Sequence, residues 1–248
     1  IIELIEKDDI PKYLLFLENA FPYMDNYNYH KGMNGIIQEL TGLLKTKNIG
    51  TDSDRALLLD FQATLETKPE KAIKLEKDAL AQIENITADN ARLVSNLHAN
   101  LGGLYRMNGH PDLAREHMEK SISLLDQFNL LHINDSIPQI ANYAMFLTEQ
   151  QEPERGISEL QKLSGIIKEY HSDECLDYAK VQETLGTIYL MTANLPQAKT
   201  HFKRAFKIYE KIWADEPEMI EAKYQEIQEL YPQIGFSIGK TLSGLLTK

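Results

Sequence analysis

The stretch LGGLYRMNGHPDLAREHMEKS, residues 101–121, decides the fold, because residues 185–205, LGTIYLMTANLPQAKTHFKRA, repeat its pattern at the same offsets. In both stretches a Leu-Gly-x-x-Tyr run is followed, twelve residues after the Gly, by an Ala. A Met or Phe comes four positions later and a small residue three positions after that. Identical offsets in two separate stretches indicate an internal repeat, in which each copy is one supersecondary unit.

Proline residues give this repeat its period. Pro69, Pro111 and Pro153 are each 42 residues apart, whereas Pro196 falls one residue late. Each proline begins a helix-forming run, where proline is favoured because its missing N–H would have no intrahelical partner at the first helical position. Small residues inside these runs keep the period without the slip: Ala72, Ala114, Gly156 and Ala198.

We expect each copy to be a pair of antiparallel helices joined by a short turn. Apolar residues at helical spacing occupy residues 90–107 and 113–128, and Thr87 is the expected N-cap of the first of these helices. Small residues that face each other let two helix backbones approach, while larger side chains fill the space around them. Two further copies, around Leu59 and Tyr143, match the pattern more weakly.

Stacking of such pairs predicts an all-α solenoid in one domain, because no helix pair can bury its apolar face alone. We expect residues 1–50 to form a degenerate N-terminal helix pair, residues 51–217 to form four 42-residue repeats, and residues 218–248 to form capping helices. The helices expected outside the four repeats are residues 10–25, 30–45, 217–230 and 234–246.

The Leu-Gly-x-x-Tyr run and the Ala, Met or Phe, and small residues that follow it resemble the tetratricopeptide repeat family, over residues 51–217. The usual repeat has about 34 residues, and the longer 42-residue period is similar to that of kinesin light chains and of many bacterial regulators. The resemblance implies a right-handed superhelical, TPR-like solenoid. It also implies that the chain binds a peptide or protein in the concave groove lined by the first helix of each pair.

Carried over position by position, the resemblance implies which side chains face this groove. The candidate peptide-binding residues are Asn96, Asn100, Gly103, Arg106, Asn142, Met145 and Thr187. Further groove-facing positions are Ala99, Ala141, Thr148, Lys180, Glu183, Thr184 and Leu190.

Asn100 and Asn142 share one repeat position. An Asn there resembles the light-chain-like repeats in which the amide hydrogen-bonds the backbone of an extended ligand, since it offers both a donor and an acceptor. The alternative is that both are ordinary polar residues on a solvated helix face. Glu183 and Thr184 depart from the paired Lys and Asn that hold a C-terminal carboxylate in chaperone-binding relatives, which disfavours that kind of ligand.

Composition narrows the classes of function. The chain has 26 basic and 37 acidic residues and a net charge of −11, which disfavours direct binding of a nucleic-acid backbone. Its one cysteine allows neither an internal disulfide nor a Cys-rich zinc site, which suits a cytoplasmic location. No apolar run reaches about 18 residues, so we expect no membrane span. The acidic cluster over residues 215–229 is expected to be a solvated face, or alternatively to attract a basic partner.

We expect no catalytic residues, no cofactor and no metal site. The string GFSIGKT, residues 235–241, ends like a phosphate-binding loop but has three rather than four residues between its glycines. Cys175 lies at an expected helix start, yet no local signature of a general base or an oxyanion site accompanies it. The seven histidines include no His-Glu-x-x-His spacing.

The expected function is therefore that of a noncatalytic, cytoplasmic scaffold that binds a peptide or protein. Because the sequence opens on Ile1 rather than Met, one alternative is the sensor domain of a larger bacterial regulator, similar to peptide-pheromone receptors or signal-transducing ATPases. A second alternative is an enzyme on a helical solenoid.

Near the acidic cluster, three residues are candidates for an interaction patch: Tyr209, Trp213 and Met219. The alternative is that Trp213 instead seals a helix end.

Overall fold

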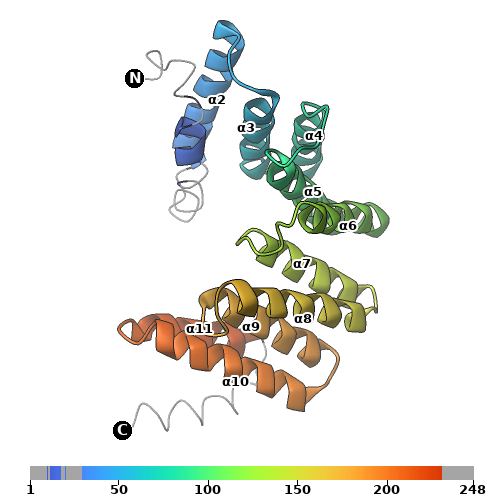
Figure 1. Ribbon diagram of the computed structural model, residues 1–248, viewed down its shortest axis with the longest axis vertical. Helices are drawn as coiled ribbons and strands as arrows, with labels where there is room; N and C mark the ends of the chain where they lie inside the picture. Colours follow the sequence, from blue (N-terminus) through green and yellow to red (C-terminus); the bar gives the residue numbers. More distant parts are fainter. Residues whose placement is uncertain (1–9, 11, 18–19, 21–29, 231–248) are drawn as a thin grey trace. The chain divides into compact units, whose positions relative to one another are not determined.

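The computed structural model describes residues 10, 12–17, 20 and 30–230, and every regular element in these residues is an α-helix (Figure 1). The chain divides into two compact units, residues 1–130 and residues 131–248. The boundary falls between the second and third repeats, so that each unit holds two of the four. The predicted helix at residues 234–246 and the GFSIGKT string lie outside the described residues.

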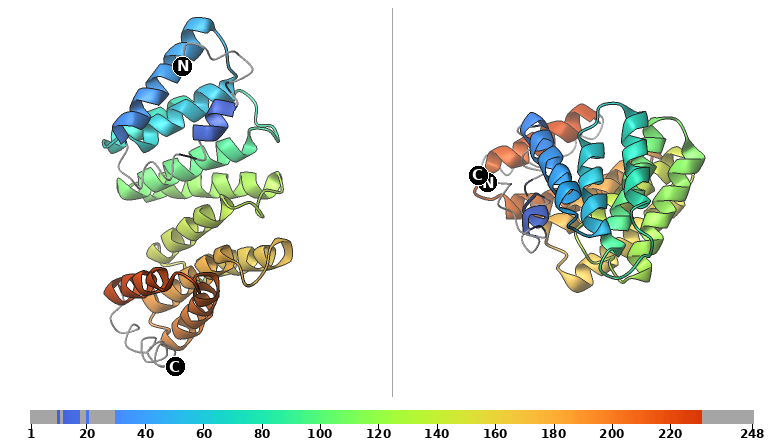
Figure 2. Two further views of the ribbon diagram at one scale, coloured as in Figure 1. Left: turned by 90° about the vertical axis from the view of Figure 1, so that its left-hand side faces the viewer. Right: turned by 90° about the horizontal axis from the view of Figure 1, so that it is seen from above.

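Unit 1 contains two helix pairs preceded by a further helix. Its helices are α2 (His30–Lys47), α3 (Asp52–Thr64), α4 (Pro69–Leu80), α5 (Ala91–Met107) and α6 (Pro111–Gln127). Helix α3 packs on α4 and α5 packs on α6, whereas α4 and α5 bring the two pairs together (Figure 2). Leu14 and Leu17, from the described part of the predicted first helix, join the core between α2 and α3.

Unit 2 repeats this arrangement and adds a closing helix. Its helices are α7 (Ser136–Glu149), α8 (Pro153–Tyr170), α9 (Leu176–Met191), α10 (Leu195–Ile212) and α11 (Pro217–Leu230). Helix α7 packs on α8 and α9 packs on α10, and the first helices α7 and α9 are also neighbours. The prediction of an all-α fold built from helix pairs is confirmed for the described residues of both units.

The second helices keep the 42-residue period throughout. Helices α4, α6 and α8 begin at Pro69, Pro111 and Pro153, and α10 begins at Leu195, which continues the same interval. The late Pro196 is therefore the second residue of α10 rather than an interruption of the repeat. A proline is tolerated anywhere in the first turn because the N–H groups there have no intrahelical acceptor.

The turns between paired helices also keep the period, although their residue types differ. Gly109, Gln151 and Ala193, each 42 residues apart, have φ angles of 74°, 65° and 59°. In the first of these turns the N–H of His110 donates to the carbonyl oxygen of Tyr105 at 2.9 Å, and the other two turns have the corresponding bond. This hydrogen bond ends the first helix after one residue in the left-handed conformation, a conformation that Gly adopts most easily.

Two glycines on first helices sit where the paired helices approach most closely. A Cβ atom added to Gly102 would lie 2.5 Å from Cγ of Met118. One added to Gly186 would lie 3.0 Å from the ring of Phe202. Both distances are shorter than ordinary van der Waals contact, so a larger residue at either position would force the facing Met118 or Phe202 side chain to shift.

The third repeat reverses the positions of the small residues. Its glycine, Gly156, lies on the second helix, and an added Cβ atom would lie 2.6 Å from the carbonyl oxygen of Ala144 on the first. Each of these three repeats thus places one Gly where its two helices meet. The predicted role of the small residues is confirmed.

One helix start differs from the expectation. Helix α5 begins at Ala91 with Asn90 as its N-cap, so the prediction of Thr87 in that position is wrong. The carbonyl oxygen of Thr87 accepts from the N–H groups of Asn90 and Ala91, because a turn precedes the helix. Helix α6, by contrast, begins at Pro111, as the proline period predicts.

Two glycines of α8 provide a matched test of the close contact. A Cβ atom added to Gly165 meets no atom within 4 Å, whereas one added to Gly156 meets backbone that cannot rotate away. We expect Gly165→Ala to stabilise the protein by about 0.5–1 kcal/mol through the lower backbone entropy of the unfolded chain. Gly156→Ala should instead destabilise it by about 1–3 kcal/mol through overpacking.

Urea denaturation followed by circular dichroism measures both free energies of unfolding. Because the two variants differ from the parent by the same methyl group on the same helix, their difference isolates the contact with α7. Equal stabilities for the two variants would contradict the close approach at Gly156.

Candidate functional site

The candidate peptide-binding residues lie on first helices in both units. Helix α5 carries Asn96, Asn100, Gly103 and Arg106; α7 carries Asn142 and Met145; and α9 carries Thr187. Within unit 1, α5 is a neighbour of α3, and within unit 2, α9 is a neighbour of α7. First helices therefore adjoin one another in each unit, which is the arrangement that a binding face made of first helices needs.

The two asparagines at the shared repeat position have different surroundings. The side-chain nitrogen of Asn100 donates to Oδ1 of Asp60 on α3 at 2.8 Å, a bond that joins adjacent repeats. Asn142 is exposed, and its side chain makes no hydrogen bond within the described part of the chain. Of the two amides, that of Asn142 is therefore the one with both its donor and its acceptor available to a ligand.

An acidic pair, Asp60 and the buried Glu76, lies next to Asn100. Glu76 on α4 is 1% exposed, and its Oε2 has no hydrogen-bond partner among the described residues. Burial raises the pKa of Glu76, and the negative charge and hydrogen bond of Asp60 raise it further, while the hydrogen bond of Asn100 acts in the opposite direction. The Glu76 carboxyl is therefore protonated at neutral pH, since an ion there would lose its hydration beside a second carboxylate.

Asp60 and Glu76 occupy the close-contact positions of the first repeat. They correspond, 42 residues earlier, to Gly102 and Met118 of the second repeat. The first repeat thus has two carboxyl groups where the second repeat has a small and a large apolar residue. The departure of residue 60 from a small residue was visible in the sequence, but the partner at residue 76 was not.

Three of the expected groove-facing side chains are engaged in bonds within the protein. The hydroxyl of Thr187 donates to the carbonyl oxygen of Glu183 at 3.1 Å, and that of Thr148 is buried and donates to Ala144. The Glu183 carboxylate accepts from Tyr209 at 2.5 Å and pairs with Lys223 at 2.9 Å, so it links α9 to α10 and α11.

Tyr209, Trp213 and Met219 do not form one apolar patch. Tyr209 is 1% exposed, which rules it out as part of a surface. The ring of Trp213, the C-cap residue of α10, stacks on it at a centroid distance of 4.8 Å. Met219 alone among the three is an exposed apolar residue. The structure therefore favours the alternative in which Trp213 seals the end of the helix.

Histidines pack between paired helices at one repeat position. The ring of His201 stacks on Tyr189, and its Nδ1 lies 2.9 Å from Oε1 of Gln182. In the second repeat His117 stacks on Tyr105 in the same way, but there Nδ1 of His98 takes the place of the amide, also at 2.9 Å. Burial, with the neighbouring charge of His117, lowers the pKa of His98 to about 4. Both rings are therefore neutral near pH 7, and one of them donates to the other.

Cys175 has a structural position at the start of α9. It is the N-cap residue, and its sulfur accepts from the N–H of Tyr178 at 3.4 Å while lying 3.2 Å from the carbonyl oxygen of Ser172. Across the described residues, no group of three or more His, Cys, Asp and Glu side chains is arranged to hold a metal ion. No helix in that part of the chain is long and apolar enough to cross a bilayer.

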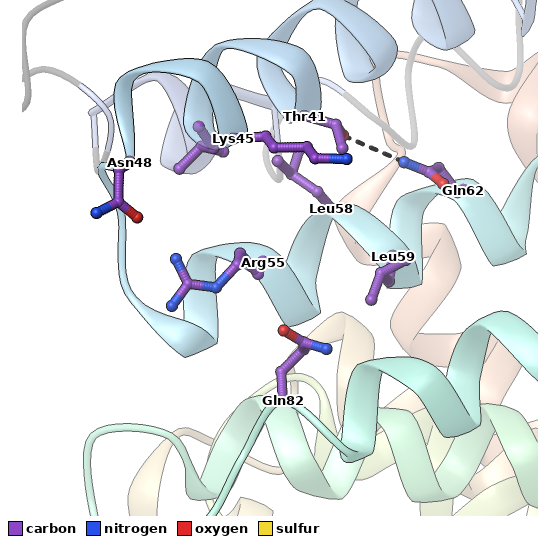
Figure 3. Close-up of a pocket in the computed structure, with 9 residues that line it drawn as sticks. Thr41, Lys45, Asn48, Arg55, Leu58, Leu59, Gln62 and Gln82 are labelled. Carbon is purple, nitrogen blue, oxygen red and sulfur yellow. Dashed lines mark hydrogen bonds between the residues drawn. The ribbon is translucent and has the colours of Figure 1, made fainter.

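Unit 1 contains a cavity that the sequence did not reveal. It has a volume of about 370 Å³ and lies among α2, α3 and the turn after α4. Lys45 on α2 and Gln82 after α4 point toward it, and a hydrogen bond of 3.2 Å from Gln62 to Thr41 crosses one side (Figure 3). Arg55 at its edge is held by Asp52 and by the carbonyl oxygen of Gly50. The cavity is therefore lined largely by groups already engaged within the protein.

Comparison with known proteins identifies the repeat. The tetratricopeptide repeat family matches residues 136–211, which span α7 to α10. No curated protein matches the chain significantly over its sequence. The family match therefore covers the two helix pairs of unit 2.

Several solved structures share the fold. A putative kinesin light chain of Podosopora anserina with nearly identical TPR-like repeats is 13% identical with a TM-score of 0.64, over 85% of this chain and 99% of that one. BtubC (BKLC) from P. vanneervenii is 15% identical with a TM-score of 0.59, over 96% of this chain and 92% of that one. MamA is 16% identical with a TM-score of 0.51, over 75% and 94%. At these identities the likeness shows the fold alone, which is one of TPR-like helix pairs.

Glu76→Gln tests the protonation of the buried acid. Because the folded protein raises the pKa of Glu76 above its ordinary value of 4.5, its stability contribution is complete below that pH and is lost as the pH rises toward the folded pKa. An amide stays neutral at every pH, so we expect the variant to exceed the parent by about 1–3 kcal/mol at pH 7.5 and to match it at pH 4.

Denaturation curves at the two pH values measure this difference. Glu39→Gln on the exposed side of α2 is the matched control and should leave the pH dependence unchanged. A Glu76→Gln variant that is less stable than the parent at pH 7.5 and approaches it at pH 4 would show that the carboxylate is ionised and needed.

Proposed function

We propose that this tetratricopeptide-repeat chain is a noncatalytic scaffold that binds an extended peptide segment of a protein partner along the exposed faces of its first helices. The family match and the shared fold support a protein-binding role, because tetratricopeptide-repeat proteins generally act as scaffolds for other proteins. The single half-buried thiol suits a cytoplasmic setting, where it stays reduced.

The exposed side chain of Asn142 is the observation that carries the proposal. Its amide is exposed on α7 and has no hydrogen bond within the described chain, and Met145 lies one turn further along the same helix. An amide of this kind can donate to a peptide carbonyl and accept from a peptide N–H at once, without selecting a side chain. A half-buried Met adapts its shape to different apolar side chains of the ligand.

In unit 1, α5 carries the candidate residues Asn96, Asn100, Gly103 and Arg106 at the corresponding repeat positions. Gly103 leaves open space above the backbone, since a Cβ atom there would meet nothing within 4 Å. The peptide backbone can approach the helix closely at such a position. Asn100 contributes mainly through its bond to Asp60, which fixes α5 against α3.

A peptide selected from a random library against the whole chain provides the ligand for the test. Isothermal titration with that peptide should show that Asn142→Ala weakens binding by about fivefold to tenfold, the loss expected when one or two hydrogen bonds to the ligand backbone are removed. Asn100→Ala is the matched control at the same repeat position; it should lower thermal stability and leave affinity within about twofold.

Affinity that is unchanged in Asn142→Ala would remove this residue from the binding face. A large loss of affinity in Asn100→Ala, with stability retained, would move the site from α7 to α5. Either result would contradict the assignment of the ligand to Asn142.

A further inference from the structure

Helix α10 is strongly basic in a chain whose net charge is −11. It carries five basic residues and a single acidic one, Glu210. The basic residues are Lys199, Lys203, Arg204, Lys207 and Lys211. Local charge of this sign opposes the overall charge of the protein, and such a reversal attracts a negatively charged partner to one place on the surface.

Four of these residues line a cavity of about 470 Å³ within unit 2. Lys168, near the end of α8, faces the same cavity, as do Asp173 and Glu174 of the connection between α8 and α9. Tyr178 and Ile208 provide an apolar part of the lining. The cavity is therefore a concave, largely positive surface rather than a row of separate lysines.

The two acids of the cavity each hold one lysine at its edge. Lys168 pairs with Asp173 at 2.9 Å, which raises the pKa of the lysine and lowers that of the acid, and Lys211 pairs with Glu174. The other three basic residues of the lining are exposed and make no ion pair within the described part of the chain: Lys203, Arg204 and Lys207. Three positive charges thus remain for a ligand.

We propose that this surface of α10 binds an acidic segment of a protein partner in an extended conformation. Lys203 and Lys207 are one helical turn apart, a rise of about 6 Å. In an extended peptide, alternate residues lie on the same side about 6.6 Å apart. Acidic residues at alternate positions therefore match the lysine spacing, and the planar guanidinium of Arg204 can bind a carboxylate through two hydrogen bonds.

The surroundings of the cavity favour a short acidic segment over a long polyanion. Helix α11 packs on α10 and exposes the carboxylates of Glu218, Glu221, Glu226 and Glu229. A long polyanion would need further positive charges beyond these three, and the exposed charged residues of the neighbouring helix α11 are acidic. The surface also belongs mainly to a second helix, so it is separate from the first-helix face of the proposed function, and a ligand at either does not need the other.

The probe is a fluorescein-labelled peptide of alternating Glu and Gly with four Glu residues, followed by fluorescence anisotropy with the whole chain at 50 mM salt. We expect saturable binding that weakens at least tenfold at 300 mM salt. The double variant Lys203→Glu plus Lys207→Glu should weaken binding at least tenfold. Lys31→Glu plus Lys71→Glu, which makes the same change of net charge at exposed sites in unit 1, should leave it within twofold.

Lys203→Ala plus Lys207→Ala keeps the test valid if charge reversal perturbs folding, and it should give an intermediate loss. Equal weakening by the α10 and control variants, or no saturation at millimolar protein, would overturn the proposal. A single-stranded oligonucleotide that binds as tightly as the acidic peptide would also overturn it in favour of nucleic acid. Because these variants leave α7 untouched, failure here would not affect the titration of Asn142→Ala.

Discussion

The close approach of two helix backbones at one small residue is the contact on which the second, third and fourth repeats depend. Gly102, Gly156 and Gly186 each occupy a position where an added Cβ atom would meet a neighbour at 3.0 Å or less. Because the contact fixes the separation of the two helices, it also fixes which residues of the first helix are buried and which are exposed. The packing contact on one side of the first helix thus determines which residues form the exposed face on its other side, the face that we assign to ligand binding.

In the first repeat this contact is built from other residues. Asp60 and Glu76 place two carboxyl groups at the junction, and the buried one must stay protonated. Asn100 of the next repeat then bonds to Asp60, so an amide on the binding face is used within the protein. A change in the core of one repeat therefore alters the chemistry that its neighbour can offer to a ligand.

The sequence predicted the helix pairs well because the prolines, the small residues and the apolar spacing all indicate the same 42-residue period. The shared repeat position predicted that Asn100 and Asn142 lie on solvent-facing sides of their helices, but not that Asn100 alone bonds to a neighbouring repeat. The position of a residue on a helix indicates where its side chain points, and not which partner the next repeat presents. The burial of Tyr209 was missed for the same reason: its carboxylate partner, Glu183, lies on another helix. The basic residues of α10 were readable in the sequence, but their convergence with Lys168 on one cavity required the fold.

Conversion of the first repeat to the apolar contact of the third is the most direct test of this account. The variant Asp60→Ala plus Glu76→Leu installs the residue types found at Ala144 and Leu160. Its free energy of unfolding at pH 7.5, measured by urea denaturation, should exceed that of the parent by about 1–4 kcal/mol, as when buried ionisable groups are replaced by well-packed apolar ones. Equal or lower stability would contradict the claim that a small residue facing a large apolar one is what holds each helix pair together.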